Sequence, residues 1–127
     1  MEVIQNGTKD FKTGFFIGKL HDVSQADLQN EFCFFAKTDQ ENSLVCPTEF
    51  MPDDMIERED GWRAFRIQGI LDFSLIGILA EISSMLADHK IGIFVISTYN
   101  TDYILTKAEN FERAVRVLAD HGYEITH

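Results

Sequence analysis

Cysteine is scarce in this chain, and long apolar runs are missing from it. Cys33 and Cys46 are its two cysteines, and each lies in an apolar stretch typical of a strand, which predicts buried free thiols. No stretch approaches the roughly 18 uncharged apolar residues of a membrane span. The first residues also lack the basic and apolar regions of a secretion signal. We therefore expect a cytoplasmic protein without membrane association.

Basic side chains are few compared with acidic ones. The chain has 11 lysines and arginines against 21 aspartates and glutamates, and its formal net charge is −10. Most of such a surface repels a phosphate backbone or an anionic membrane. We therefore expect no nucleic-acid partner.

Catalytic signatures are missing as well. The sequence contains no G-x-S-x-G elbow, Walker loop, G-x-G-x-x-G, H-E-x-x-H or C-x-x-C. The four histidines fall at a turn, at two helix ends and at the chain end, which favours exposure or the helix dipole over metal ligation. The sequence predicts no catalytic residue, no metal site and no cofactor, so we expect a protein that is not an enzyme.

Apolar residues make up 45% of the 127 residues, and 11 of them are phenylalanine, which is ample for a packed interior. In the second half, segments whose apolar residues recur every second position alternate with segments whose apolar residues have helical spacing. Its second helix begins at Thr106, whose hydroxyl has capping-box spacing with Glu109. The predicted elements are a strand over 62–68, a helix over 75–86 capped by Asp72 or Ser74, strands over 91–97 and 103–105, a helix from 106 and a strand over 123–126.

This order of elements predicts an α+β, ferredoxin-like βαββαβ fold, in which two helices cover one face of an antiparallel sheet. The first half shows strand patterns over 12–20, 32–37 and 43–46, with a short helical turn over 24–30. It has room for a reduced version of the same unit, whose second helix is short or absent. An acidic stretch over 48–61 predicts a solvated connection, so we place two sub-domains at residues 1–60 and 61–127.

Several strands are apolar on both faces, and residues 32–35 and 93–96 are the clearest cases. If helices cover one face of a sheet, an apolar second face must also be kept from water. The other half of the chain, a second copy of the chain, or both can cover it. We expect a homodimer or a close pairing of the two halves.

Two segments can form a binding site. The first is the strand-to-helix turn from Asp72 to Gly77, whose free backbone N–H groups and positive dipole end suit a carboxylate. The alternative is that its side chains only cap the helix and Gly77 only eases packing. The second is the polar stretch from Ser97 to Tyr103, for which a hairpin loop is the alternative. Ferredoxin-like connectivity brings Asp102 within reach of the first segment, so one ligand could contact both.

At these residues the sequence resembles the ACT domain family, and more closely the small two-ACT proteins related to the CASTOR arginine sensors. The matching stretches are 61–63, 69–80 and 93–103. The resemblance implies paired ACT units with an amino acid bound at the interface between units. It also implies that Asp102 meets the guanidinium of an arginine ligand and that the turn from Asp72 to Gly77 closes over it. Leu75 departs from the sensor pattern, which is acidic at that position.

Together these observations predict a non-catalytic regulatory or sensor protein that binds a small molecule, an amino acid by the resemblance. A structural or oligomerisation module without a retained ligand is the alternative. The expected ligand-binding residues are Asp72, Phe73, Ser74, Leu75, Ile76, Gly77, Thr98, Tyr99, Asn100, Thr101 and Asp102.

Overall fold

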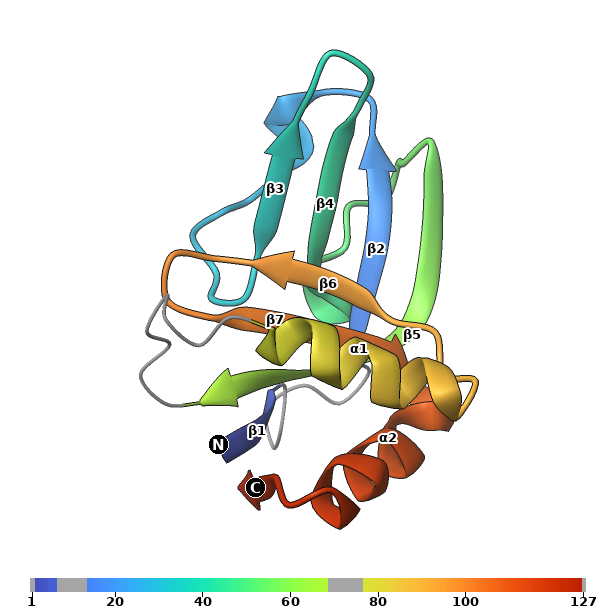
Figure 1. The fold of residues 1–127 in the computed structure, drawn as a ribbon. Helices are drawn as coiled ribbons and strands as arrows, with labels where there is room; N and C mark the ends of the chain where they lie inside the picture. The colour runs from blue at the N-terminus through green and yellow to red at the C-terminus, as the bar shows by residue number, and fades with distance from the viewer. Residues whose placement is uncertain (1, 7–13, 69–76, 127) are drawn as a thin grey trace. The chain divides into compact units, whose positions relative to one another are not determined.

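The computed structural model describes residues 2–6, 14–68 and 77–126 (Figure 1). The chain forms two compact units, which we call the N-terminal unit (residues 9–62) and the C-terminal unit (residues 1–8 and 63–127). The long strand β5 (Glu57–Gln68) continues from the first unit into the second. The contacts group residues 1–8 with the C-terminal unit, whereas the sequence alone had placed them in a sub-domain at residues 1–60.

The C-terminal unit has the predicted ferredoxin-like order of elements. After β5 come α1 (Ile78–Asp88), β6 (Phe94–Ser97), β7 (Asp102–Lys107), α2 (Ala108–Asp120) and β8 (Glu124–Thr126). In the sheet β5 pairs with β7, and β7 pairs with β6 in an antiparallel hairpin. The α+β fold class is therefore confirmed.

Strand β1 (Glu2–Asn6) is an addition to this unit that the sequence did not predict. It lies between β5 and β8, antiparallel to the former and parallel to the latter. In the plain βαββαβ fold the strands corresponding to β5 and β8 are neighbours. Here the start of the chain separates them, and the strand order of the unit is β8-β1-β5-β7-β6.

Both helices of the C-terminal unit pack on one face of its sheet. Phe65 and Ile67 alternate with Ala64 and Arg66 along β5, and the first pair lies in the core, as the period-2 pattern predicts. The helices contribute their apolar stripes to the same core, which holds Ile82, Met85, Leu86, Phe111, Ala114, Val115, Val117 and Leu118.

The start of α2 differs from the prediction. Strand β7 extends to Lys107, so the helix begins at Ala108 with Lys107 as its N-cap and without a side-chain cap. Thr106 is fully buried and its hydroxyl donates to the carbonyl of Lys107. The predicted capping box between Thr106 and Glu109 is therefore wrong, because pairing with the sheet holds the backbone of Thr106 in the extended conformation.

The N-terminal unit is a reduced copy of the same plan. Its strands β2 (Phe15–Leu20), β3 (Phe34–Lys37), β4 (Asn42–Pro47) and the first part of β5 lie in the antiparallel order β3-β4-β2-β5. That is the ferredoxin-like order, with single 3-10 turns, η1 (Val23–Gln25) and η2 (Thr48–Phe50), where helices would stand. A small core of Phe16, Leu20, Leu44 and Cys46 fills the covered face. The predicted reduced ACT-like unit is confirmed, with its helical turn shorter than expected.

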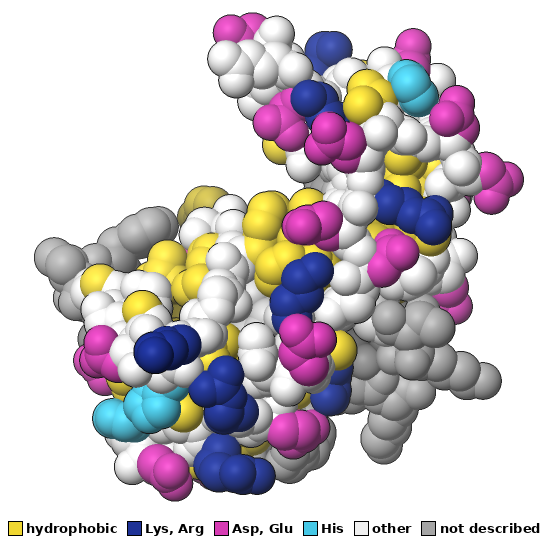
Figure 2. Space-filling model, turned by 90° about the vertical axis from the view of Figure 1, so that its right-hand side faces the viewer, with side chains coloured by type: hydrophobic (Ala, Val, Ile, Leu, Met, Phe, Trp, Pro, Cys, Tyr) yellow, Lys and Arg dark blue, Asp and Glu magenta, His cyan; other side chains and the backbone are white. Residues whose placement is uncertain are grey.

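The acidic stretch before residue 61 is partly strand rather than a plain connection. Residues Glu57 to Asp60 are exposed and pair with β2 at the edge of this unit's sheet. Charged side chains on an edge strand discourage pairing with foreign strands. The register then shifts by one residue before Trp62, and Gly61 has φ +81, the left-handed conformation that glycine adopts in one common type of β-bulge. On the face shown in Figure 2, acidic side chains are scattered rather than gathered in one patch.

Candidate ligand-binding site

The predicted site residues that the structure describes lie at one end of the C-terminal unit. Strand β5 ends there at Gln68, the β6–β7 turn joins Ser97 to Asp102, and helix α1 begins there after Gly77 (Figure 1). The other members of the first predicted segment lie outside the described residues: Asp72, Phe73, Ser74, Leu75 and Ile76.

Two threonines shape the β6–β7 turn. The amide of Thr98 donates to the carbonyl of Thr101 over 2.8 Å, and the Thr98 hydroxyl donates to the same carbonyl over 2.9 Å. The amide of Thr101 returns a bond of 3.3 Å to the Thr98 hydroxyl. These bonds close the turn and leave Tyr99, at 93% exposure, and Asn100 in solvent. Both tip residues are therefore free to meet a ligand or another surface.

The Thr101 side chain fixes where this turn lies. Its hydroxyl donates to the backbone carbonyl of Ile67, 34 residues earlier in the chain. Ile67 is the penultimate residue of β5, so this hydrogen bond holds the turn beside the C-terminal end of β5. The predicted adjacency of the end of β5 and the start of β7 is present in the structure.

Asp102 is the one acid of the turn, and it is half-buried. The hydroxyl of Ser97, its partner across the hairpin, donates to its Oδ1 over 2.5 Å. Among the described residues, no lysine, arginine or histidine forms an ion pair with Asp102. An ionised carboxylate accepts several hydrogen bonds, so Asp102 keeps acceptor capacity for an ammonium or guanidinium group.

The start of α1 offers the opposite polarity. Gly77 is the N-cap, with φ +94 and no side-chain cap, in place of the predicted Asp72 or Ser74. The first helical hydrogen bond runs from the amide of Glu81 to the carbonyl of Gly77 over 2.8 Å. The amides of the first turn have no acceptor within the helix and carry the positive end of its dipole. A carboxylate fits this helix end.

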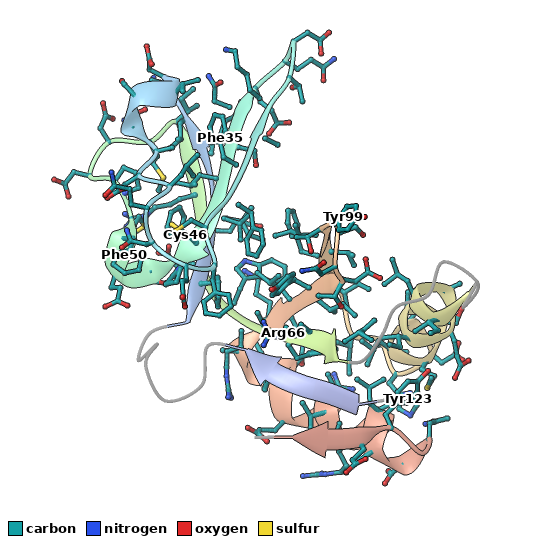
Figure 3. The ribbon with its side chains drawn as sticks, turned by 90° about the vertical axis from the view of Figure 1, so that its left-hand side faces the viewer. Phe35, Cys46, Phe50, Arg66, Tyr99 and Tyr123 are labelled. Carbon is teal, nitrogen blue, oxygen red and sulfur yellow. The ribbon has the colours of Figure 1, made fainter. Side chains whose placement is uncertain are left out.

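Arg66 lies near these residues and was not predicted, whereas Tyr103 ended the second candidate segment but was not among the expected ligand-binding residues. Nη1 of Arg66 lies 3.4 Å from the Tyr103 hydroxyl, across the β5–β7 pair. Among the described residues, nothing forms a hydrogen bond with the buried Nε of Arg66. Figure 3 shows Arg66 on β5. The alternation of β5 already placed Arg66 opposite Phe65 and Ile67, so the signal for a cation on the face away from the helices was present.

Other kinds of site find little support in the described part of the chain. No three histidine, cysteine, aspartate or glutamate side chains gather there as metal ligands would. Nδ1 of His89 lies 2.9 Å from the carbonyl oxygen of Met85, and Nδ1 of His121 lies 2.8 Å from that of Val117, so each ring forms a hydrogen bond within its own helix end. Of the helices described, none is long and apolar enough to cross a membrane.

Solved structures share this fold over nearly the full chain. A protein of Agobacterium tumefaciens superposes with a TM-score of 0.82 at 28% identity, covering 98% of this chain and 91% of that one. Aspartokinase alpha and beta subunits give a TM-score of 0.63 at 16% identity, with 94% and 96% covered. The regulatory subunit of aspartate kinase from Thermus thermophilus gives 0.56 at 11%, with 84% and 88% covered.

A search of curated proteins found no match. The family model described as ACT domain matches residues 57–120, just over half of the 127 residues. The match runs from the start of β5 to the end of α2 and so contains the β6–β7 turn and α1. This chain belongs to the ACT domain family.

Proposed function

We propose that this protein is a non-catalytic regulator that binds an amino acid at the end of the C-terminal unit where α1 and β7 begin. Binding there would change an interface that a partner protein reads. A cytoplasmic location and the absence of catalytic activity belong to the same proposal.

The observation that carries the proposal is the pairing of opposite polarities at one end of a sheet. Asp102 has spare acceptor capacity for a cationic group, and the start of α1, whose N-cap Gly77 has no side chain, suits a carboxylate. A free amino acid carries both groups. Membership of the ACT family and similarity of fold to a regulatory subunit of aspartate kinase support a regulatory role.

Arginine is the first amino acid to test, because the sequence resembles the arginine sensors around Asp102. Leu75 departs from the acidic residue of those sensors. We therefore expect a side chain other than arginine to be accepted as well, and a panel of amino acids is needed.

Thermal shift and calorimetry against the common amino acids test the proposal. A ligand that binds the folded state alone adds about 2.7 kcal/mol of stability at a hundredfold excess over Kd. We expect one or a few amino acids to raise the melting temperature, and Asp102→Asn to weaken that binding at least tenfold.

Asp120→Asn is the matched control. Asp120 is exposed at the end of α2, so this change removes the same charge far along the chain from the turn. Equal loss in both variants would assign the effect to net charge. A flat response of the parent protein to the whole panel would contradict the proposal and favour a module that only assembles.

A further inference from the structure

The β3–β4 hairpin of the N-terminal unit brings the two cysteines together. Its last ladder pair joins Phe34 to Val45, so the next residues outward, Cys33 and Cys46, face each other across the hairpin. Cys46 belongs to the small core of this unit, Cys33 packs against the same core, and both thiols are free. Residues 13 positions apart are thereby adjacent in space.

The geometry suits a covalent bond. Directly opposed residues of an antiparallel pair have Cα atoms about 4.5–5.5 Å apart, which lies inside the range of about 4.4–6.8 Å for disulfides. Both side chains lie on the same face of the sheet, because Cys46 belongs to the small core and Cys33 packs against it. Figure 3 shows Cys46 in this core with Phe35 and Phe50. Closing the bond requires side-chain rotation and no rearrangement of strands.

The two thiols differ in access. Cys46 is 1% exposed, whereas Cys33 is half-buried beside the edge strand β3. Burial raises the pKa of both thiols. The neighbouring thiol adds to this increase at Cys46 and partly offsets it at Cys33. Cys33 is therefore the thiol that a reagent reaches and that ionises first.

We propose that Cys33 and Cys46 form an intrachain disulfide by exchange with a low-molecular-weight disulfide such as oxidised glutathione. The Cys33 thiolate attacks one sulfur of the reagent, which leaves a mixed disulfide on Cys33 and releases one thiolate. The Cys46 thiolate then attacks Sγ of Cys33 and releases the second thiolate. The two protons of the cysteines end on the two released thiols, so the reagent is reduced by two electrons and the protein is oxidised by two.

This modification is separate from the proposed amino-acid site, because it involves the N-terminal unit alone. Its effect is to tie β3, an outer strand, covalently to β4. Because the thiolate is the attacking species, the rate should rise about tenfold per pH unit while the pH stays below the thiol pKa.

The test uses the full chain, reduced and then incubated at low concentration with oxidised glutathione under native conditions. Intact-mass spectrometry and thiol titration should show loss of two thiols without a lasting glutathione adduct. A peptide map should show the Cys33 and Cys46 peptides linked. The oxidised protein should melt at a higher temperature than the reduced one.

Two variants separate the steps. Cys46→Ser removes the resolving thiol and should accumulate a stable glutathione adduct on Cys33, whereas Cys33→Ser should keep its buried thiol free. The proposal is overturned if the parent protein retains both thiols, if it stops at the adduct, or if the bond forms only in denaturant. It is also overturned if the product is a cross-linked dimer.

Discussion

The hydroxyl of Thr101 ties the β6–β7 turn to strand β5 through the carbonyl of Ile67. Thr101→Val keeps the shape of the side chain but leaves the carbonyl of the buried Ile67 without its donor, so we expect a loss of about 1 kcal/mol in unfolding free energy. Thr101→Ser keeps the hydroxyl and should lose less than half as much. Urea denaturation of the three proteins checks this, and equal stability of the valine variant would show that the turn does not depend on the bond.

Tyr123 supplies a prediction about pH. Its hydroxyl donates to Oε1 of Glu81 over 2.8 Å, linking the segment before β8 to α1. Burial, and then the neighbouring Glu81 carboxylate, raise the pKa of Tyr123 from its ordinary 10.0 to about 12. A raised pKa in the folded state gives stability that is complete below pH 10 and is lost as the pH rises toward 12.

We therefore expect Tyr123→Phe to cost about 0.5–1 kcal/mol near neutral pH. The difference in unfolding free energy from the parent should shrink as the pH rises from 10 to 12. Chemical denaturation at a series of pH values measures it. A difference that stays constant across that window would mean that the phenol titrates alike in the folded and unfolded chains.

At the scale of secondary structure, the entry into α1 depends on a glycine. Gly77 has φ +94, whereas a Cβ placed there would meet nothing within 4 Å. The cost of Gly77→Ala is therefore one of backbone conformation alone, about 1 kcal/mol. Gly92→Ala is the matched control, because that position is equally open and its φ is not positive. The control should change stability by less than about 0.5 kcal/mol. Thermal melts of both variants measure the difference, and equal stability would show that the positive φ of Gly77 has no cost for alanine.

The elements that the sequence predicted are those with a strong local period. Helix α2 and strand β5 repeat their apolar residues at 3.6 and 2 residues, and Phe65, Phe111 and Leu118 lie in the core as expected. Strand β1 has five residues and pairs with segments about 60 and 120 residues later. No local pattern carries that pairing, so it was missed.

In the candidate site, too, the sequence predicted what a local pattern indicates and missed what depends on distant contacts. Polar residues between two apolar strands predicted the turn at Thr98 to Asp102, and topology predicted its place beside the end of β5. The bond that secures the turn ends on the backbone carbonyl of Ile67. Every residue carries such a carbonyl, so sequence alone does not single it out. The alternation of β5 predicted that Arg66 faces away from the core. It did not predict the contact between Arg66 and the Tyr103 hydroxyl.

For the whole molecule, we expect the homodimer to form through strand β6. This strand lies at the edge of the C-terminal sheet, and Ile96 points to the face opposite Val95, which packs against the core. Ile96 is half-buried, so it can still lose apolar surface to a second copy. Sedimentation at micromolar concentration should show a dimer that Ile96→Lys weakens at least tenfold.

Val23→Lys is the control for that change, because Val23 is an exposed apolar residue of the N-terminal unit, at 43% exposure. It should leave the dimer intact. Circular dichroism confirms that both variants keep their secondary structure. Sedimentation of the parent as a monomer at every concentration would contradict the expected assembly.

The insertion of β1 between β5 and β8 limits the order in which the strands of the C-terminal sheet can pair during folding. During synthesis β1 is made before both of its neighbours, because its antiparallel partner follows some 60 residues later and its parallel partner some 120 residues later. The nascent β1 must therefore wait with both hydrogen-bonding edges unmatched. The C-terminal sheet is therefore completed only after β8 has been made, some 120 residues after β1.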